Sequence, residues 1–160
     1  MCCYHASLVM IPDETPMQIR PFTPADTEAV LAIWLEASLQ AHHFIEPAYW
    51  HANLAPMREI YLPAADSQLL CLGEQVLGFY SLHEGSLAAL FVAPARQGQG
   101  LGKALLEHAK QQLPTLRLQV YQQNWAACDF YRTQGFQVAA EGVDPHTGCA
   151  EWLMVWPARD

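Results

Sequence analysis

The stretch Arg96-Gln97-Gly98-Gln99-Gly100-Leu101-Gly102-Lys103 decides the fold. It follows the apolar run Leu87–Val92 and leads into a segment whose apolar residues recur at helical spacing. Three alternate glycines remove side chains where a ligand could approach the backbone. The first turn of a helix leaves amide N–H groups unpaired at the positive end of the helix dipole. A strand, a glycine loop and a helix in this order predict an anion-binding loop suited to a pyrophosphate.

Two common phosphate loops do not fit this stretch. A nucleoside-triphosphate loop reads G-x-x-x-x-G-K-S/T, and alignment on Gly102 and Lys103 puts Gln97 at the first glycine and Ala104 at the hydroxyl position. A dinucleotide fingerprint, G-x-G-x-x-G, needs a glycine where Lys103 stands. A glycine turn without a ligand is also disfavoured, because so many glycines cost backbone entropy. Nucleotide hydrolysis is therefore set aside.

The rest of the chain alternates between helical and strand patterns. Met17 to Phe22 is typical of a short edge strand closed by Pro21, and Thr23-Pro24-Ala25-Asp26 is a strong helix start. Pro56 should kink or divide the second helix. In chain order we expect a strand at 17–22, helices from 23 and over 47–62, strands at 68–72, 76–82 and 87–92, a helix from 101, a strand at 116–121, a helix over 124–135, and strands at 136–140 and 151–156.

This order predicts one α/β (α+β) domain, with a mixed central sheet of about seven strands and about four helices on its faces. The 160 residues suit a single domain, and 52% of them are apolar, enough for a full core. No apolar run approaches the roughly 20 residues of a membrane-spanning helix. We therefore expect no membrane partner.

Charge and cysteine content limit the function classes. The net charge of −8 is opposite to that of most nucleic-acid binders, so a nucleic-acid partner is not expected. The acidity either favours a cationic substrate or only keeps the protein in solution. The five cysteines are odd in number and form no C-x-x-C pair, which predicts reduced thiols in a cytoplasmic protein and no zinc or other metal site.

The first sixteen residues differ from the remainder. They show no sustained periodicity and are interrupted by Pro12 and Pro16. We expect residues 1–16 to be a disordered or non-native extension, and residues 17–160 to form the domain. Met17 is the predicted functional start, with Met1 as the alternative.

Two motifs at matching spacing carry a family resemblance. Gln97-x-x-Gly100-x-Gly102 resembles the R/Q-x-x-G-x-G/A coenzyme A motif of the GNAT superfamily of N-acetyltransferases. The segment Asn124-x-x-Ala127-x-x-Phe130-Tyr131-x-x-x-Gly135-Phe136 resembles a later segment of that family, and Leu90-Phe91-Val92-x-Pro94 resembles its fourth strand. Within the superfamily the chain is most similar to small bacterial stand-alone enzymes. The resemblance implies a sheet that is splayed between strands 4 and 5.

The resemblance also implies acetyl-CoA as cosubstrate and a set of residues that bind it. Backbone groups of the fourth strand would pair with pantetheine amides, and the glycine loop would hold the pyrophosphate. Asn124 is expected to cap a helix or to contact the cofactor arm, and the two roles can coexist. The residues expected to bind acetyl-CoA are Leu90, Phe91, Val92, Gln97, Gly98, Gln99, Gly100, Leu101, Gly102, Lys103 and Asn124.

Two residues are predicted to be catalytic. Tyr131 matches the family's tyrosine, and a phenol can donate a proton to the leaving thiolate. The segment Ser86–Val92 offers no carboxylate to take the proton of the amine, so the resemblance favours His42 as the base. His43, His83 and Glu84 are the other candidates for this base, and a water chain or an amine that arrives neutral could replace a dedicated base.

The expected function is transfer of an acetyl group to a primary amine by direct attack. The acceptor is either a small amine or amino acid, or a protein lysine or N-terminus. Phe44, Tyr49 and Trp50 could wall a compact pocket, which favours a small amine, or they could be core residues. The alternative function is a non-catalytic module that binds or senses coenzyme A. A homodimer is left open, because the family is often dimeric but the sequence shows no dimer surface.

Overall fold

The computed structural model describes residues 16–157, which form a single domain built on one seven-stranded sheet. The sheet order is β1-β2-β3-β4-β5-β7-β6. Except for Pro16, the predicted extension over residues 1–16 lies outside the described residues. The strands are β1 (Met17–Pro21), β2 (Asp66–Leu72), β3 (Gln75–His83), β4 (Ser86–Val92), β5 (Leu116–Tyr121), β6 (Gln137–Val143) and β7 (Ala150–Trp156).

The helices follow the predicted order. A short 3-10 turn, η2 (Pro24–Asp26), leads into α1 (Thr27–Ala41). The predicted second helix is broken into α2 (Pro47–Ala52), α3 (Leu54–Pro56), a π-helical turn η3 (Met57–Tyr61) and α4 (Leu62–Ala64). The π turn begins directly after Pro56, which lacks the N–H that a regular α-helix needs. Another 3-10 turn, η4 (Pro94–Arg96), leads towards α5 (Leu101–Gln112), and α6 (Trp125–Thr133) follows β5.

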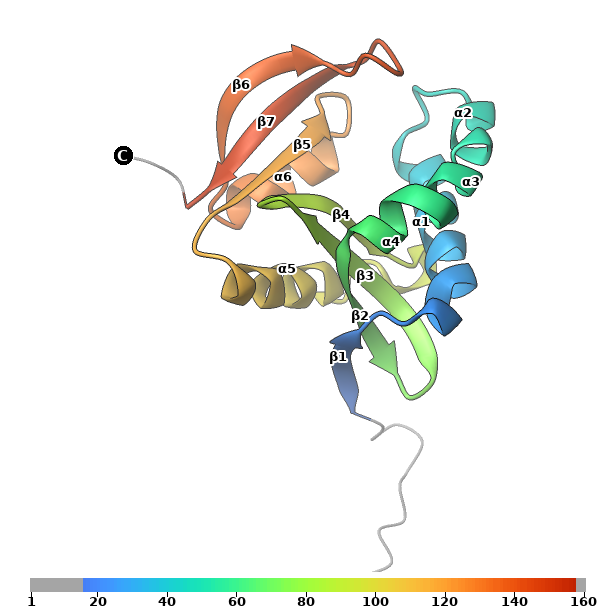
Figure 1. Cartoon of the computed structure of the whole chain (residues 1–160). Helices are drawn as coiled ribbons and strands as arrows, with labels where there is room; N and C mark the ends of the chain where they lie inside the picture. The colour runs from blue at the N-terminus through green and yellow to red at the C-terminus, as the bar shows by residue number, and fades with distance from the viewer. Residues whose placement is uncertain (1–15, 158–160) are drawn as a thin grey trace, which may run out of the picture.

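Two hydrophobic clusters hold the helices to opposite faces of the sheet. Figure 1 shows α1–α4 gathered on one side of the sheet and α5 with α6 on the other. On the α1 side, Val30, Leu31 and Trp50 pack with Phe79 of β3. The side chains that pack on the opposite face include Leu70, Tyr80, Leu105, Leu106, Leu118, Tyr131 and Met154. The alternation of Leu118 and Val120 with Gln119 and Tyr121 places polar side chains of β5 on the α1 side.

The sheet opens between β4 and β5. These two strands run parallel and pair at Ser86 and Arg117 alone. The Arg117 guanidinium holds them together at that point, because its Nε donates to the Ser86 Oγ at 2.9 Å and its Nη2 donates to the Glu84 carbonyl at 2.7 Å. Beyond it, β5 pairs along its length with β7, from Leu116 to Tyr121. The predicted splay between the fourth and fifth strands is therefore present.

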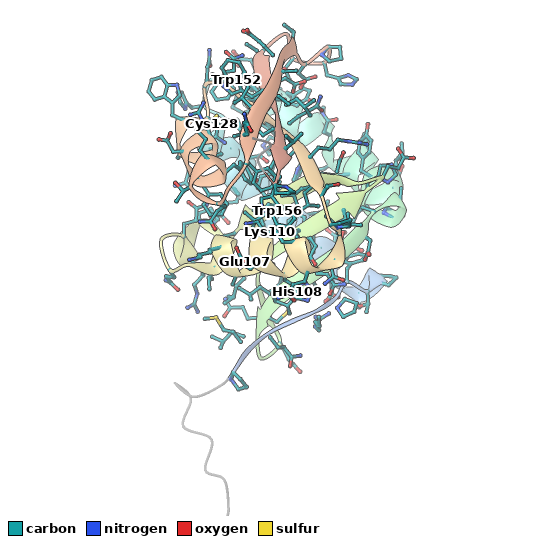
Figure 2. All side chains as sticks on the ribbon, turned by 90° about the vertical axis from the view of Figure 1, so that its left-hand side faces the viewer. Glu107, His108, Lys110, Cys128, Trp152 and Trp156 are labelled. Carbon is teal, nitrogen blue, oxygen red and sulfur yellow. The ribbon has the colours of Figure 1, made fainter. Side chains whose placement is uncertain are left out.

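A polar cluster fastens the end of β7 to α5. Lys110 lies beside Trp156 on the side of the sheet away from α1 (Figure 2), and its Nζ is 5.1 Å from the centre of the Trp156 ring. The same Nζ donates to the Gln134 carbonyl at 2.6 Å, at the end of α6. One lysine thus joins α5, α6 and β7. This contact fixes the strand that carries Glu151 relative to the glycine loop.

Candidate active site

A cavity of about 1210 Å³ occupies the opening between β4 and β5. Its lining comes from β4, the glycine loop and the start of α5, from β5, from α6 and from the end of α1. A cavity of this size accommodates an extended ligand of the size of a cofactor. The elements that the sequence predicts as separate motifs therefore meet in one space.

The glycine loop forms one wall of this cavity. Gly98 and Gly100 have φ values of +78° and +79°, a backbone region that residues with a Cβ rarely adopt. Gly100 caps α5, and the first amide bonded back to it is that of Ala104, at 3.1 Å from the Gly100 carbonyl. The preceding amides at the start of α5 are free to meet a ligand. Arg96 and Lys103 add positive charge to the same wall.

The free edge of β4 forms the second wall. The Ala93 amide donates to the Leu77 carbonyl of β3 at 2.8 Å. Because backbone groups of a strand alternate between its two sides, those of Leu90 and Val92 point into the opening. The Gln97 side chain is hydrogen-bonded to this edge, since its Nε2 donates to the Val92 carbonyl at 3.2 Å. An extended ligand with amide groups could pair here as an added strand does.

The third wall carries Asn124 and Tyr131 of α6. The Asn124 side chain caps the helix by accepting from the Ala127 amide at 3.3 Å. Tyr131 lies near the end of α6. Its ring packs edge-on against Phe130 and Phe136, and the residue is 9% exposed. Burial, with a smaller contribution from nearby Cys128, raises the pKa of the Tyr131 phenol well above its usual range. Within residues 16–157 its hydroxyl has no hydrogen-bond partner, so the proton is free for a ligand in the cavity.

His42 closes the cavity from the α1 side. Its ring stacks on Trp50, with centroids 5.0 Å apart, and meets Tyr121 edge-on at 5.3 Å. The Asn124 Nδ2 lies 3.3 Å from the His42 Nε2, which joins the end of α1 to the start of α6. Burial lowers the pKa of His42 to about 4, so the imidazole is neutral at physiological pH. Its Nδ1 is buried with no partner among the described residues.

A second cavity, of about 860 Å³, lies on the α1–α4 side of the opening. It shares five lining residues with the first, so the two spaces meet there: Ala88, Ala89, Gln119, Asp144 and Glu151. Its remaining walls come from the helical segment around Tyr49 and Tyr61 and from the β6–β7 loop at His146. Figure 1 shows the tip of this loop reaching towards α2. The two cavities are therefore neighbours at these five residues.

The two carboxylates at the junction differ in their surroundings. Asp144 accepts from the Tyr121 hydroxyl at 2.5 Å and from the His146 amide at 2.9 Å. Burial acts to raise the pKa of Asp144, but these hydrogen bonds outweigh it and lower the pKa overall. Burial, and then the charge of Asp144, raise the pKa of Glu151. The pKa of Asp144 is thus lowered, whereas the pKa of Glu151 is raised.

Most residues that the sequence singles out meet in the first cavity. Its lining includes His42, Leu90, Phe91, Val92, Gln97, Gly98, Gly100, Leu101, Gly102, Lys103, Asn124 and Tyr131, but not Gln99. Phe91 also stacks its ring on Phe79 of the α1-side core. Of the other base candidates, His83 lines the second cavity, whereas His43 and Glu84 line neither.

Sequence reasoning missed the polar residues that join the two cavities. These are Gln119 on β5, Asp144 in the β6–β7 loop and Glu151 on β7; Tyr121 of β5, which lines the first cavity alone, was missed as well. The alternation of polar and apolar residues along β5 could have indicated them, because polar side chains on one face of a central strand point to a cavity on that face. Nothing in the sequence indicated that Asp144 returns to that face.

The glycine loop, the free edge of β4 and the neighbouring second cavity suit a protein that binds an extended ligand next to a second molecule. A sequence model described as "Acetyltransferase (GNAT) domain" matches residues 63–138. The chain is 38% identical to peptidyl-lysine N-acetyltransferase YiaC of Escherichia coli K12, over 87% of this chain and 96% of that protein. It is 34% identical to peptidyl-lysine N-acetyltransferase YjaB of Salmonella typhimurium, over 76% of this chain and 84% of that protein.

A solved structure agrees with these sequence matches. The solution structure of apo-form YjaB from Escherichia coli superposes with a TM-score of 0.79 at 28% identity, covering 88% of this chain and 97% of that one. The chain therefore belongs to the GNAT family, and it is an acetyl-CoA-dependent N-acyltransferase. The predictions of family, fold class and enzyme class are confirmed.

Two further expectations concern membranes and metals. No helix within residues 16–157 is both long and apolar enough to cross a membrane. In the same range, no three His, Cys, Asp or Glu side chains gather as metal ligands would. The cytoplasmic location, the homodimer and the absence of a nucleic-acid partner stay predictions.

Proposed function

We propose that this enzyme transfers the acetyl group of acetyl-CoA to the ε-amine of lysine side chains in proteins, with Tyr131 as the acid for the leaving thiolate. The observation that carries the proposal is the pair of connected cavities, in which Tyr131 lies with the glycine loop and the carboxylates lie where the second cavity joins. The relatives described above are named for peptidyl-lysine acetylation, which supports this acceptor class.

The donor would lie along the first cavity. The free amides at the start of α5 and the charges of Arg96 and Lys103 would hold the pyrophosphate. The edge groups of Leu90 and Val92 would pair with the pantetheine amides, after the Gln97 side chain leaves the Val92 carbonyl. Gln99 lies outside this lining and has no role in the proposal.

Tyr131 would protonate the sulfur. The amine nitrogen attacks the thioester carbon, the carbon–sulfur bond breaks, and the electron pair leaves on sulfur. The raised pKa keeps the Tyr131 phenol protonated at physiological pH, so a donor is present when charge develops on sulfur. Its unpaired hydroxyl means that no internal hydrogen bond must be broken first.

The sequence names His42 as the base, and its surroundings favour a positioning role. Burial makes the imidazole a weak base, and the Asn124 amide occupies Nε2. A neutral His42 would hold Asn124, and with it the first turn of α6, against the first cavity. The assignment of His42 as the base stays a prediction.

Protein lysine fits the second cavity better than a small amine does. Trp50 lines the first cavity but not the second, and it is 6% exposed and packs edge-on against Trp34. Tyr61, by contrast, is 56% exposed and also lines the second cavity. An aromatic side chain at an open mouth is typical of a surface that meets a larger partner.

The test compares acceptors in a thiol-release assay. With acetyl-CoA as donor, a peptide with one internal lysine should be turned over faster than free lysine at equal concentration. A preference for free lysine or another small amine would contradict the acceptor class. Binding of acetyl-CoA without turnover on any amine would favour the alternative, a non-catalytic module that senses coenzyme A.

A further inference from the structure

The junction of the two cavities carries a carboxylate whose role the family motifs do not explain. Glu151 lies on β7 directly opposite Tyr121 of β5, on the face that the acceptor would approach. Gln119 lies on the same face of β5 and lines both cavities, but an amide cannot take a proton. Asp144 and Glu151 are the carboxylates among the residues common to both linings.

We propose that Glu151 receives the proton of the acceptor ammonium, and that Asp144 provides the fixed negative charge that draws the ammonium to it. This assignment rests on the proposed function and deepens it, because it names the residues that recognise and deprotonate lysine. A lysine ε-ammonium must lose a proton before its nitrogen can attack, since its ordinary pKa is about 10.4.

The surroundings of Asp144 and Glu151 differ in a way that suits Asp144 to binding the ammonium and Glu151 to taking its proton. Asp144 is tied by the Tyr121 hydroxyl and the His146 amide, so it stays ionised and in place. The Glu151 carboxylate has no hydrogen-bond or ion-pair partner within residues 16–157, although its side chain is partly buried. In many active sites the surroundings of two neighbouring carboxylates make their pKa values different. One carboxylate then acts by its charge and the other transfers a proton.

Glu151, Tyr131 and solvent account for every proton that moves in the reaction. The ammonium gives one proton to Glu151, which releases it to solvent through the open second cavity. The neutral nitrogen attacks the thioester carbon and loses its second proton to solvent as the carbon–sulfur bond breaks and the amide forms. The thiolate takes one proton from Tyr131, whose phenol is restored from solvent. The net products are the acetylated lysine, the free thiol and one proton.

Several other titratable groups face this junction and bear on any pH profile. The second cavity is also lined by Tyr49, Tyr61, His83 and His146. Tyr121 faces Glu151 across the strand pair, and His42 lines the first cavity. Glu141 lies on β6 opposite Trp152 and lines neither cavity. A change in pH dependence must therefore be read as a difference between variants and not from one curve.

The experiment compares Glu151→Gln with Glu141→Gln, a matched loss of one carboxylate on β6 that lines neither cavity. The substrates are acetyl-CoA and two peptides, one with lysine and one with thialysine, whose amine is less basic because of its sulfur. Glu151→Gln should lower kcat/KM for the lysine peptide by about 100-fold or more. It should leave the Kd for acetyl-CoA within about twofold, and the loss should be several-fold smaller on thialysine and at higher pH.

Further variants separate proton transfer from attraction and from folding. Asp144→Asn should raise KM for both peptides alike, with no advantage for thialysine. Glu151→Asp, which keeps a carboxylate, repeats the test if Glu151→Gln melts early, and it should retain more activity than the amide. Equal activity of Glu151→Gln and wild type on lysine would overturn the assignment and leave the proposed function intact. Failure of the wild type itself on the lysine peptide would instead overturn the proposed function.

Discussion

Replacing His42 by Phe tests the packing that joins the two sides of the active site. Phenylalanine keeps a ring on Trp50 but cannot titrate. In the folded protein the pKa of His42 falls from an ordinary 6.5 to about 4 because the ring is buried. The unfolded chain therefore binds a proton more readily as the pH drops, so the wild type loses stability as pH falls from about 6.5 towards 4.

The size of this loss follows from the shift. At about 1.4 kcal/mol per pKa unit, the wild type should lose about 2 kcal/mol of unfolding free energy between pH 7 and about pH 4.5 that the Phe variant does not lose. For a chain of this length the difference corresponds to a Tm change of roughly 4–8 °C. Protonation would also remove the Nε2 acceptor for Asn124, so both effects act in the same direction.

Urea unfolding of both proteins across this pH range measures the effect. The two free-energy curves should diverge below about pH 6.5, because every other titrating group is common to both proteins. Parallel curves would mean that His42 titrates at its ordinary value and is not buried against Trp50 and Tyr121. The positioning role of His42 would then be wrong.

Three further predictions concern the donor site and the sheet. Tyr131→Phe should lower kcat for the lysine peptide about 100-fold while the Kd for acetyl-CoA, measured by calorimetry, changes little; unchanged turnover would refute the acid role. Gly100→Ala should cost about 1 kcal/mol at a φ of +79° and weaken acetyl-CoA binding, whereas the control Gly142→Ala, with open space at its Cβ, should bind normally. Gly78→Ala would set a Cβ 2.8 Å from the Phe91 carbonyl oxygen and should lower stability by about 1–3 kcal/mol in urea unfolding, and unaltered stability would contradict this close approach.

The fold was predictable because the residues that begin and end its helices and strands act locally. Pro21 closes β1, the turn after Leu72 separates β2 from β3, and Gly135, with a φ of +93°, ends α6. Each signal acts within a few residues, so periodicity and turn chemistry suffice to find it. The break after Pro56 was predicted, but its form as a π turn depends on how α1 and the sheet hold that segment.

The donor half of the site was predictable for a similar reason. Gly98, Gly100 and the start of α5 are neighbours in sequence, so one stretch encodes the whole loop. The acceptor half depends on strand order. Glu151 reaches Tyr121 only because β7 lies between β5 and β6, and Asp144 returns to the same place through the β6–β7 loop. No local pattern encodes contacts of that kind, so the sequence offered His42, and not Glu151, as a candidate base.

The most direct test of lysine acetylation is the mass of a peptide acceptor after incubation with the enzyme and acetyl-CoA. The peptide should carry one internal lysine and a blocked N-terminus, with a second peptide that has arginine in place of the lysine. The account predicts that the lysine peptide gains the mass of one acetyl group, that the arginine peptide does not, and that Tyr131→Phe slows the gain. An unmodified lysine peptide, with acetyl-CoA shown to bind, would contradict it.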